Sequence, residues 1–121
     1  MGKIKTYKEL KVWQKSIELV DEVYKIAKQL PKLELYILSS QMIRSAISIP
    51  ANIAEGWARN YRAEFVRFLG IGYASALELE THLLISQRQY SKINYEQAFS
   101  LLTEVEKMMS VLILKIKEQN N

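Results

Sequence analysis

Apolar residues recur at alternating steps of four and three along the last quarter of the chain. The positions are Ala98, Leu102, Val105, Met109, Leu112 and Ile116. This spacing places all of these side chains on one side of an α-helix, which is the pattern of a helix packed against other helices. We therefore expect a helix over residues 95–118, with Asn94 and Gln97 in capping-box spacing at its start.

Three further segments show helical periodicity, at about residues 7–30, 33–59 and 62–89. The 121 residues include only 4 glycines and 2 prolines, so few positions are available for the turns that a small β-protein needs. The links between the segments are about two to five residues long, which requires neighbouring helices to run antiparallel. We predict one domain over residues 1–121, an all-α antiparallel four-helix bundle in up-down-up-down order.

Capping and breaking residues indicate where these helices begin and end. Thr6 and Glu9 have capping-box spacing before the first helix, Pro31 ends that helix, and Asn60 is the expected N-cap of the third. Pro50 lies inside the second helix. Because apolar periodicity persists on both sides of Pro50, we expect a continuous helix that is kinked there.

The first helix has more apolar surface than one bundle core needs. We expect one apolar row to face the core and the row beside it to form a subunit interface. The row expected to face the core, called the Trp13 row below, is Leu10, Trp13, Ile17, Val20, Tyr24 and Ala27. The row expected at the interface, called the Val23 row, is Val12, Leu19, Val23, Ile26 and Leu30.

Missing residue types exclude several kinds of site. The chain has no cysteine, which excludes disulfides and thiolate chemistry and suits a reducing cytoplasm. No apolar run approaches the roughly 20 residues that span a bilayer, so we expect a cytoplasmic protein without a membrane partner. His82 is the one histidine and Asp21 the one aspartate, and they lie on different expected helices. We therefore predict no metal, no cofactor, no small-molecule substrate and no enzymatic activity.

The formal charge of +4 is concentrated near the N-terminus, since residues 1–32 contain 8 Lys and only 4 acidic residues. Lys8, Lys11 and Lys15 share one face of the first helix. A solvated lysine face is the commoner explanation of such a row, and contact with nucleic-acid phosphate is the functional one.

A second basic cluster surrounds the expected turn between the second and third helices. Arg59 and Arg62 lie there beside Trp57 and Tyr61. Aromatic rings stack on bases while arginines hold phosphate, although Trp57 equally suits the closed end of a core. The candidate nucleic-acid-binding residues are thus Lys8, Lys11, Lys15, Arg59 and Arg62.

The second helix also has a polar row, with Gln41, Arg44, Ser48, Asn52, Glu55 and Arg59 at steps of three and four. The rest of the helix is apolar, so we expect it to be the most buried of the four, and buried polar groups need partners. We predict a buried polar network of Arg44, Asn52 and Glu55 with Glu78 of the third helix. A site for a ligand or RNA is the alternative interpretation.

Several short motifs resemble a known family. They are SIPANIAEG at residues 48–56, VWQ at 12–14 and ELET at 78–81, and the match spans nearly the whole chain. This sequence resembles the bacterial four-helix-bundle family of 23S ribosomal RNA intervening-sequence proteins. It departs at Ile43, where members usually have a second basic residue, and at Tyr61, where a serine cap is common.

The resemblance implies a bundle that assembles into a ring, typically a homopentamer, in a family whose molecular function is not established. A similar bundle is the nucleic-acid-binding accessory protein of diversity-generating retroelements, which is an analogy of fold. We therefore expect a non-catalytic homo-oligomer that binds nucleic acid, most plausibly RNA, through its basic surface. The alternative is a structural or protein–protein interaction module without a nucleic-acid role.

Overall fold

The computed structural model describes residues 4–119, and that part of the chain is helical without any β-strand. The four α-helices are α1 (Lys11–Ala27), α2 (Leu38–Ala58), α3 (Arg62–Gln89) and α4 (Glu96–Gln119). Two short 3-10 turns precede α1 and α2, namely η1 (Tyr7–Glu9) and η2 (Lys32–Glu34). The predicted all-α class and the packing of four helices as a bundle are confirmed.

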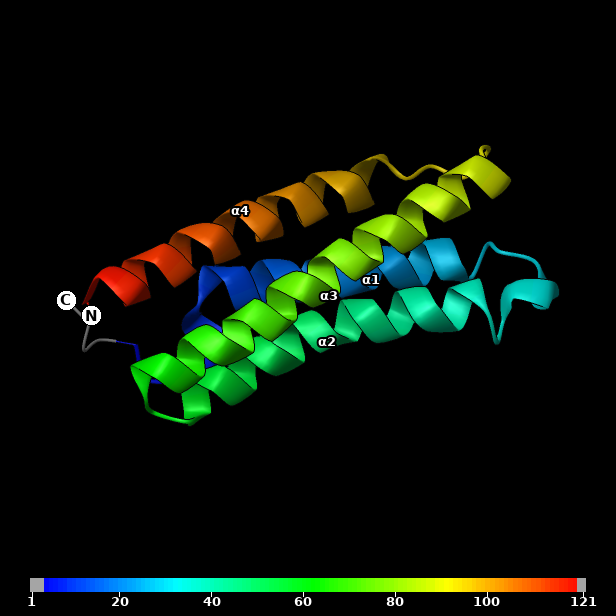
Figure 1. The fold of residues 1–121 in the computed structure, drawn as a ribbon. Helices are drawn as coiled ribbons and strands as arrows, with labels where there is room; N and C mark the ends of the chain where they lie inside the picture. The colour runs from blue at the N-terminus through cyan, green and yellow to red at the C-terminus, as the bar shows by residue number, and fades with distance from the viewer. Residues whose placement is uncertain (1–3, 120–121) are drawn as a thin grey trace.

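Each helix packs on its neighbours in the chain, and α1 also packs on α4 to close the bundle. The interface between α2 and α3 is the most extensive. Both chain ends and the α2–α3 turn lie at one end of the molecule, whereas the α1–α2 and α3–α4 connections lie at the other (Figure 1). The end of the bundle that holds the α2–α3 turn is called the turn end below.

The start of the first helix differs from the prediction. Thr6 Oγ1 accepts a hydrogen bond from the Lys8 amide at 3.4 Å, but this bond caps the 3-10 turn η1 rather than α1. The Glu9 carboxylate accepts from the Lys5 amide, so the reciprocal bond of a capping box is replaced by another. Leu10 is extended, with φ −72° and ψ 125°, and α1 begins only at Lys11.

The prediction of which apolar row of α1 faces the core is wrong. The Val23 row is the core row, since Leu19 and Val23 are fully buried and Val12, Ile26 and Leu30 are nearly so. In the Trp13 row only Ala27 is buried, and Ile17 and Tyr24 remain 37% and 39% exposed. Leu10, Trp13 and Val20 pack partly against the core, so Ile17 and Tyr24 are the residues of this row that the core leaves exposed.

The second helix begins later than predicted. The segment after Pro31 forms η2 and then bends, and Leu33, Leu35, Tyr36 and Ile37 are exposed before α2 starts at Leu38. From there α2 continues through Pro50 to Ala58 without interruption. The helix thus tolerates the missing Pro50 amide, and the bend expected at that position stays a prediction.

The boundaries of α3 and α4 are close to those predicted, but Asn60 does not cap α3. It has a φ of 64°, in the left-handed region that asparagine tolerates at the residue after a helix, and therefore it terminates α2. Tyr61 is the extended residue before α3. At the start of α4, Asn94 Oδ1 accepts from the amide of Glu96, the first residue of the helix, at 2.9 Å, and not from Gln97 as a capping box requires.

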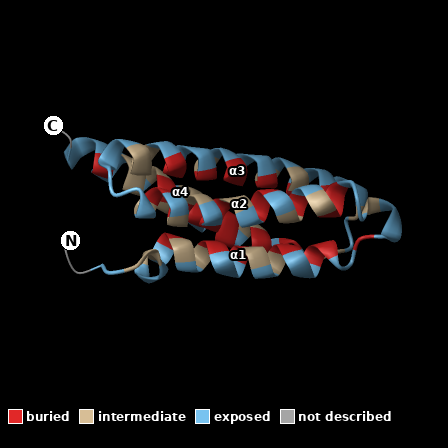
Figure 2. Cartoon of the chain, turned by 90° about the horizontal axis from the view of Figure 1, so that it is seen from below, coloured by how far each residue is buried: buried red, intermediate tan, exposed pale blue. Residues whose placement is uncertain are grey.

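The core consists of the buried faces that all four helices turn toward the bundle axis, shown in red in Figure 2. The apolar row of α4 behaves as predicted: Ala98, Leu102, Val105, Met109 and Ile116 are buried and Leu112 packs against them. None of the described helices is long and apolar enough to cross a membrane.

Candidate nucleic-acid interface

Close approach of α2 and α3 shapes the turn end. A Cβ added to Gly56 would lie 2.7 Å from Phe68 Cβ and 3.1 Å from a ring carbon of Phe65, so only glycine fits there without displacing α3. Three residues, Arg59, Asn60 and Tyr61, then connect the helices. The short connection leaves the Tyr61 ring 72% exposed at the tip of the bundle.

A hollow of about 580 Å³ opens beside this turn. Trp57, Tyr61, Arg62 and Phe65 supply the large side chains that line it. The aromatic rings offer flat surfaces on which bases stack, and the guanidinium offers donors that suit phosphate. This combination is what recognition of an unpaired nucleotide requires.

The N-terminal segment packs onto the same end of the bundle. The Tyr7 ring lies edge-on to Trp57, with centroids 6.5 Å apart, and edge-on to Trp13 at 5.4 Å. Trp57 is therefore partly enclosed by η1. The same contacts bring Lys8 and Lys11, both exposed, to the end that holds the α2–α3 turn.

The two predicted arginines of the turn end are exposed, and each makes one contact with another residue of the chain. Arg59 forms a salt bridge of 3.0 Å with Glu55, one helical turn away. Arg62 donates to the backbone carbonyl of Gln119 at 2.6 Å, which ties the start of α3 to the end of α4. Both contacts are at the surface, where a ligand phosphate competes with them at little cost.

The rim next to this turn holds a further arginine that the sequence reasoning missed. Arg67 makes a two-point contact with Glu64 at 3.1 and 3.2 Å. The hydrogen bond lowers the pKa of Glu64 and raises that of Arg67. The Arg59 and Arg67 guanidiniums both lie over the Phe68 ring, at 5.0 and 4.5 Å from its centroid. Only the tertiary structure places these two cations around one ring.

Basic residues outnumber acidic ones in the segments that meet at the turn end, residues 4–11, 55–67 and 112–119. The acidic residues there are Glu9, Glu55, Glu64 and Glu118. The basic residues are Lys5, Lys8, Lys11, Arg59, Arg62, Arg67, Lys115 and Lys117. An excess of positive charge at one end of an elongated molecule attracts polyanions over roughly a Debye length.

Lys15, predicted to belong to the same basic surface, lies elsewhere. It is one turn further along α1, where its ammonium is 3.8 Å from Glu104 of α4 and 4.0 Å from Glu18. Lys15 therefore links α1 to α4 along the side of the bundle. The structure brings together the other four predicted residues, Lys8, Lys11, Arg59 and Arg62, at the turn end.

The predicted buried polar network is wrong in most of its members. Arg44, Glu55 and Glu78 are exposed, and Glu55 forms a salt bridge with Arg59 of its own helix. The α2–α3 interface is instead bridged by small polar groups. Ser48 and Ser75 share a hydrogen bond of 2.8 Å, and Asn52 Nδ2 donates to the Ser48 carbonyl at 2.7 Å and to its hydroxyl at 3.0 Å.

The single histidine also takes part in this interface. His82 Nδ1 lies 3.4 Å from Ser45 Oγ. A serine beside a histidine is the arrangement that nucleophilic catalysis uses. However, Ser45 is 4% exposed, and its hydroxyl lies within bonding distance of the Gln41 and Met42 carbonyls. A nucleophile needs access to substrate and a proton that its base can accept, so this pair suits packing better than catalysis.

A pair of carboxyl groups lies on the opposite side of α3, facing α4. Glu106 Oε2 is buried without a hydrogen-bond partner among the described residues. Burial, and next the bond and charge of Glu80, raise the pKa of Glu106 to about 7. Two ionised carboxylates cannot hydrogen-bond to each other, because both are acceptors only. When Glu106 is protonated, its O–H can donate to the Glu80 carboxylate. Sequence reasoning missed this pair because it joins two helices.

Comparisons with known proteins identify the family of this chain. The family model of the 23S rRNA-intervening sequence proteins matches residues 8–113. A solved structure of a protein of unknown function from the S23 ribosomal protein family of Bacteroides thetaiotaomicron is similar, with a TM-score of 0.73 and 31% identity, over 84% of this chain and 97% of that one. No curated protein gives a significant match. Since the family match covers most of its length, the chain belongs to the 23S rRNA-intervening sequence protein family.

Proposed function

We propose that this protein is a non-catalytic homo-oligomer that binds single-stranded RNA at its turn end. The observation that carries the proposal is the exposed Tyr61 ring next to Arg62, at a hollow lined by aromatic side chains. Lys8 and Lys11 lie at the same end and supply charge without base selectivity. In this arrangement bases stack on Tyr61 while cations contact the phosphates on either side.

The oligomer is proposed on separate grounds. The Trp13 row leaves Ile17 and Tyr24 more than a third exposed, and α3 exposes Ile71, Leu77, Leu84 and Ile85. Apolar side chains concentrated on helix faces favour contact with another protein surface. A ring that repeats the turn end several times would bind a long RNA more tightly than one copy does, because the later contacts become intramolecular.

Fluorescence anisotropy with a labelled single-stranded RNA of mixed sequence tests the RNA-binding proposal. Tyr61→Ala is expected to weaken binding by about 5- to 100-fold, the range measured for loss of one stacked base. Lys8→Glu combined with Lys11→Glu should weaken it further and flatten its salt dependence, since fewer counterions are released. Lys28→Glu with Lys32→Glu makes the same charge change at the other end of the bundle and should have a smaller effect.

Two results would contradict the proposal. One is the absence of binding at low salt, and the other is equal loss of affinity in the variants of both ends of the bundle. If the turn-end variants bind RNA normally, or if the wild-type protein binds none, the alternative of a protein–protein interaction module stands instead. Each variant must keep its helical circular dichroism, so that lost binding is not lost folding.

A further inference from the structure

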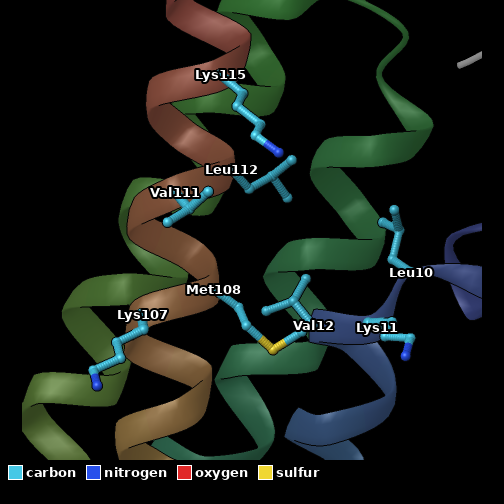
Figure 3. Close-up of a pocket in the computed structure, with 8 residues that line it drawn as sticks. All are labelled: Leu10, Lys11, Val12, Lys107, Met108, Val111, Leu112 and Lys115. Carbon is cyan, nitrogen blue, oxygen red and sulfur yellow. The ribbon is translucent and has the colours of Figure 1, made fainter.

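An apolar groove of about 380 Å³ lies between the beginning of α1 and the second half of α4 (Figure 3). Leu10 and Val12 form one wall, and Met108, Val111 and Leu112 form the other. In Figure 3, Met108 and Val12 point toward each other, and Leu112 points into the space above them. Half of the Val111 side chain is exposed, as is 60% of the neighbouring Leu114.

The path of the N-terminal segment explains why the groove is open. The η1 turn contacts α1 and α2 but not α4, because the Tyr7 ring packs against Trp57 at the end of α2. Among the described residues, the η1 turn therefore leaves the last turns of α4 uncovered. One turn further along, the Lys15–Glu104 contact joins α1 and α4 and closes the groove at that side.

Three lysines surround the groove, namely Lys11 from α1 and Lys107 and Lys115 from α4. None of the three has a salt-bridge partner among residues 4–119. Lys115 leans across the groove, whereas Lys11 and Lys107 extend away from its centre (Figure 3). The groove thus presents apolar walls within a rim of unpaired positive charge.

The positions of the lysines indicate the shape of the occupant. Lys107 and Lys115 are eight residues apart on α4, which corresponds to about 12 Å along the helix axis. A single-headed amphiphile such as a fatty acid needs only one of these cations. An occupant with acidic groups spread over about 12 Å matches the whole rim, and two turns of a helix have that length.

We propose that the groove binds an acidic amphipathic helix of a partner protein. Its apolar residues, at i, i+3, i+4 and i+7, pack on Met108, Val111 and Leu112, and flanking acidic side chains pair with Lys107, Lys115 and Lys11. This is helix-in-groove recognition, in which apolar anchors determine affinity and rim charges determine register. The groove and the Tyr61 hollow share no lining residue, although Lys11 belongs both to the rim of the groove and to the proposed RNA-binding surface. The groove proposal adds a protein contact and does not depend on RNA binding.

A synthetic helical peptide tests the proposal. The probe is a fluorescein-labelled peptide of about 15 residues with leucines at the anchor positions and glutamates at the flanking ones. We expect saturable binding that Lys107→Glu with Lys115→Glu weakens at least about tenfold, since two charge pairs become repulsive. Val111→Glu should abolish it, and half-exposed Val111 is a position where the fold tolerates that change. Lys28→Glu with Lys92→Glu is the charge-matched control away from the groove and should bind like wild type.

Other outcomes overturn the proposal. They are the absence of peptide binding, equal binding of a peptide with lysines in place of the glutamates, and displacement of the peptide by dodecanoate at similar affinity, which would indicate a small amphiphile site. The mass of the Val111→Glu variant in solution, measured by sedimentation, tests whether a second copy of the chain fills the groove. If this variant has a smaller mass than the wild-type protein, the groove is filled by a second copy of the chain and not by a partner helix.

Discussion

Gly56 of α2 faces Phe68 of α3 so closely that an added Cβ would lie 2.7 Å from the Phe68 Cβ. Both atoms are held by helical backbone, so neither can yield without moving a helix. This contact determines how near the two helices approach at the turn end. Gly56 also lines the hollow beside Tyr61.

Gly56→Ala should destabilise the protein by about 1–3 kcal/mol, the usual cost of overpacking a core. Gly70→Ala is the matched control, because a Cβ there meets nothing within 4 Å on an exposed part of α3. It should instead stabilise the protein by about 0.5–1 kcal/mol through helix propensity. Urea unfolding of both variants measures the difference, and equal stability of the two would contradict the close contact.

Glu106 should make stability fall as pH rises toward neutrality. Its pKa in the folded chain is about 7, against an ordinary value of 4.5, so the folded state holds the proton more tightly than the unfolded state. The contribution of this group is therefore largest below pH 4.5 and is lost as pH rises from there to about 7.

Glu106→Gln keeps a neutral donor at every pH and should remove this part of the pH dependence, becoming more stable than wild type at pH 8. Denaturant unfolding at pH 5, 6, 7 and 8 measures the effect. The control is Glu104→Gln on the same helix, where the carboxylate faces Lys15 at 3.8 Å and not another acid. An unchanged pH profile in Glu106→Gln would show that the proton is not held at this pair.

Val23 is buried and Ile17 is exposed, opposite to the prediction, and this leads to a pair of contrasting substitutions. Val23→Asp places a charge at a fully buried position and should cost more than about 3 kcal/mol or prevent folding. Ile17→Asp, at a position 37% exposed, should change stability by no more than about 1 kcal/mol but reduce the mass of the proposed oligomer. Thermal unfolding and light scattering test the two effects. A stable Val23→Asp, or an Ile17→Asp that unfolds, would contradict this assignment of the core.

Removing the hydrogen bond between Ser48 and Ser75 should lower the stability of the protein modestly, and the effects of the two single substitutions should not add. Ser75→Ala removes a 2.8 Å bond at a buried position and should cost about 1 kcal/mol. Ser48→Ala also removes an acceptor of Asn52 and should cost at least as much. The double variant should lose less stability than the sum of the two single variants, because both substitutions remove the same hydrogen bond. Ser100→Ala, at an exposed position in α4, is the control and should be neutral or slightly stabilising.

Local pattern was enough to identify the helices. The spacing of Ala98 through Ile116 alone predicts both α4 and its buried face, because a helix with one regular apolar row has a single way to face a core. The motif at residues 48–56 likewise indicates the family that the comparison confirms. Helix ends were less certain, as η1, η2 and the left-handed Asn60 show, since capping depends on backbone angles that residue types only bias.

The candidate sites depend on contacts between residues far apart in the sequence. Two apolar rows side by side on α1 are equivalent in pattern, and only packing against α2 and α4 decides that Val23 is buried while Ile17 is not. Arg44 is exposed, and the bond that joins the polar row of α2 to α3 is the one between Ser48 and Ser75. The spacing of apolar residues is sufficient to establish four amphipathic helices and their order. The tertiary structure decided which faces are covered, and so gathered Lys8, Lys11, Arg59 and Arg62 at one end, because side-chain packing between helices has no signature within a single helix.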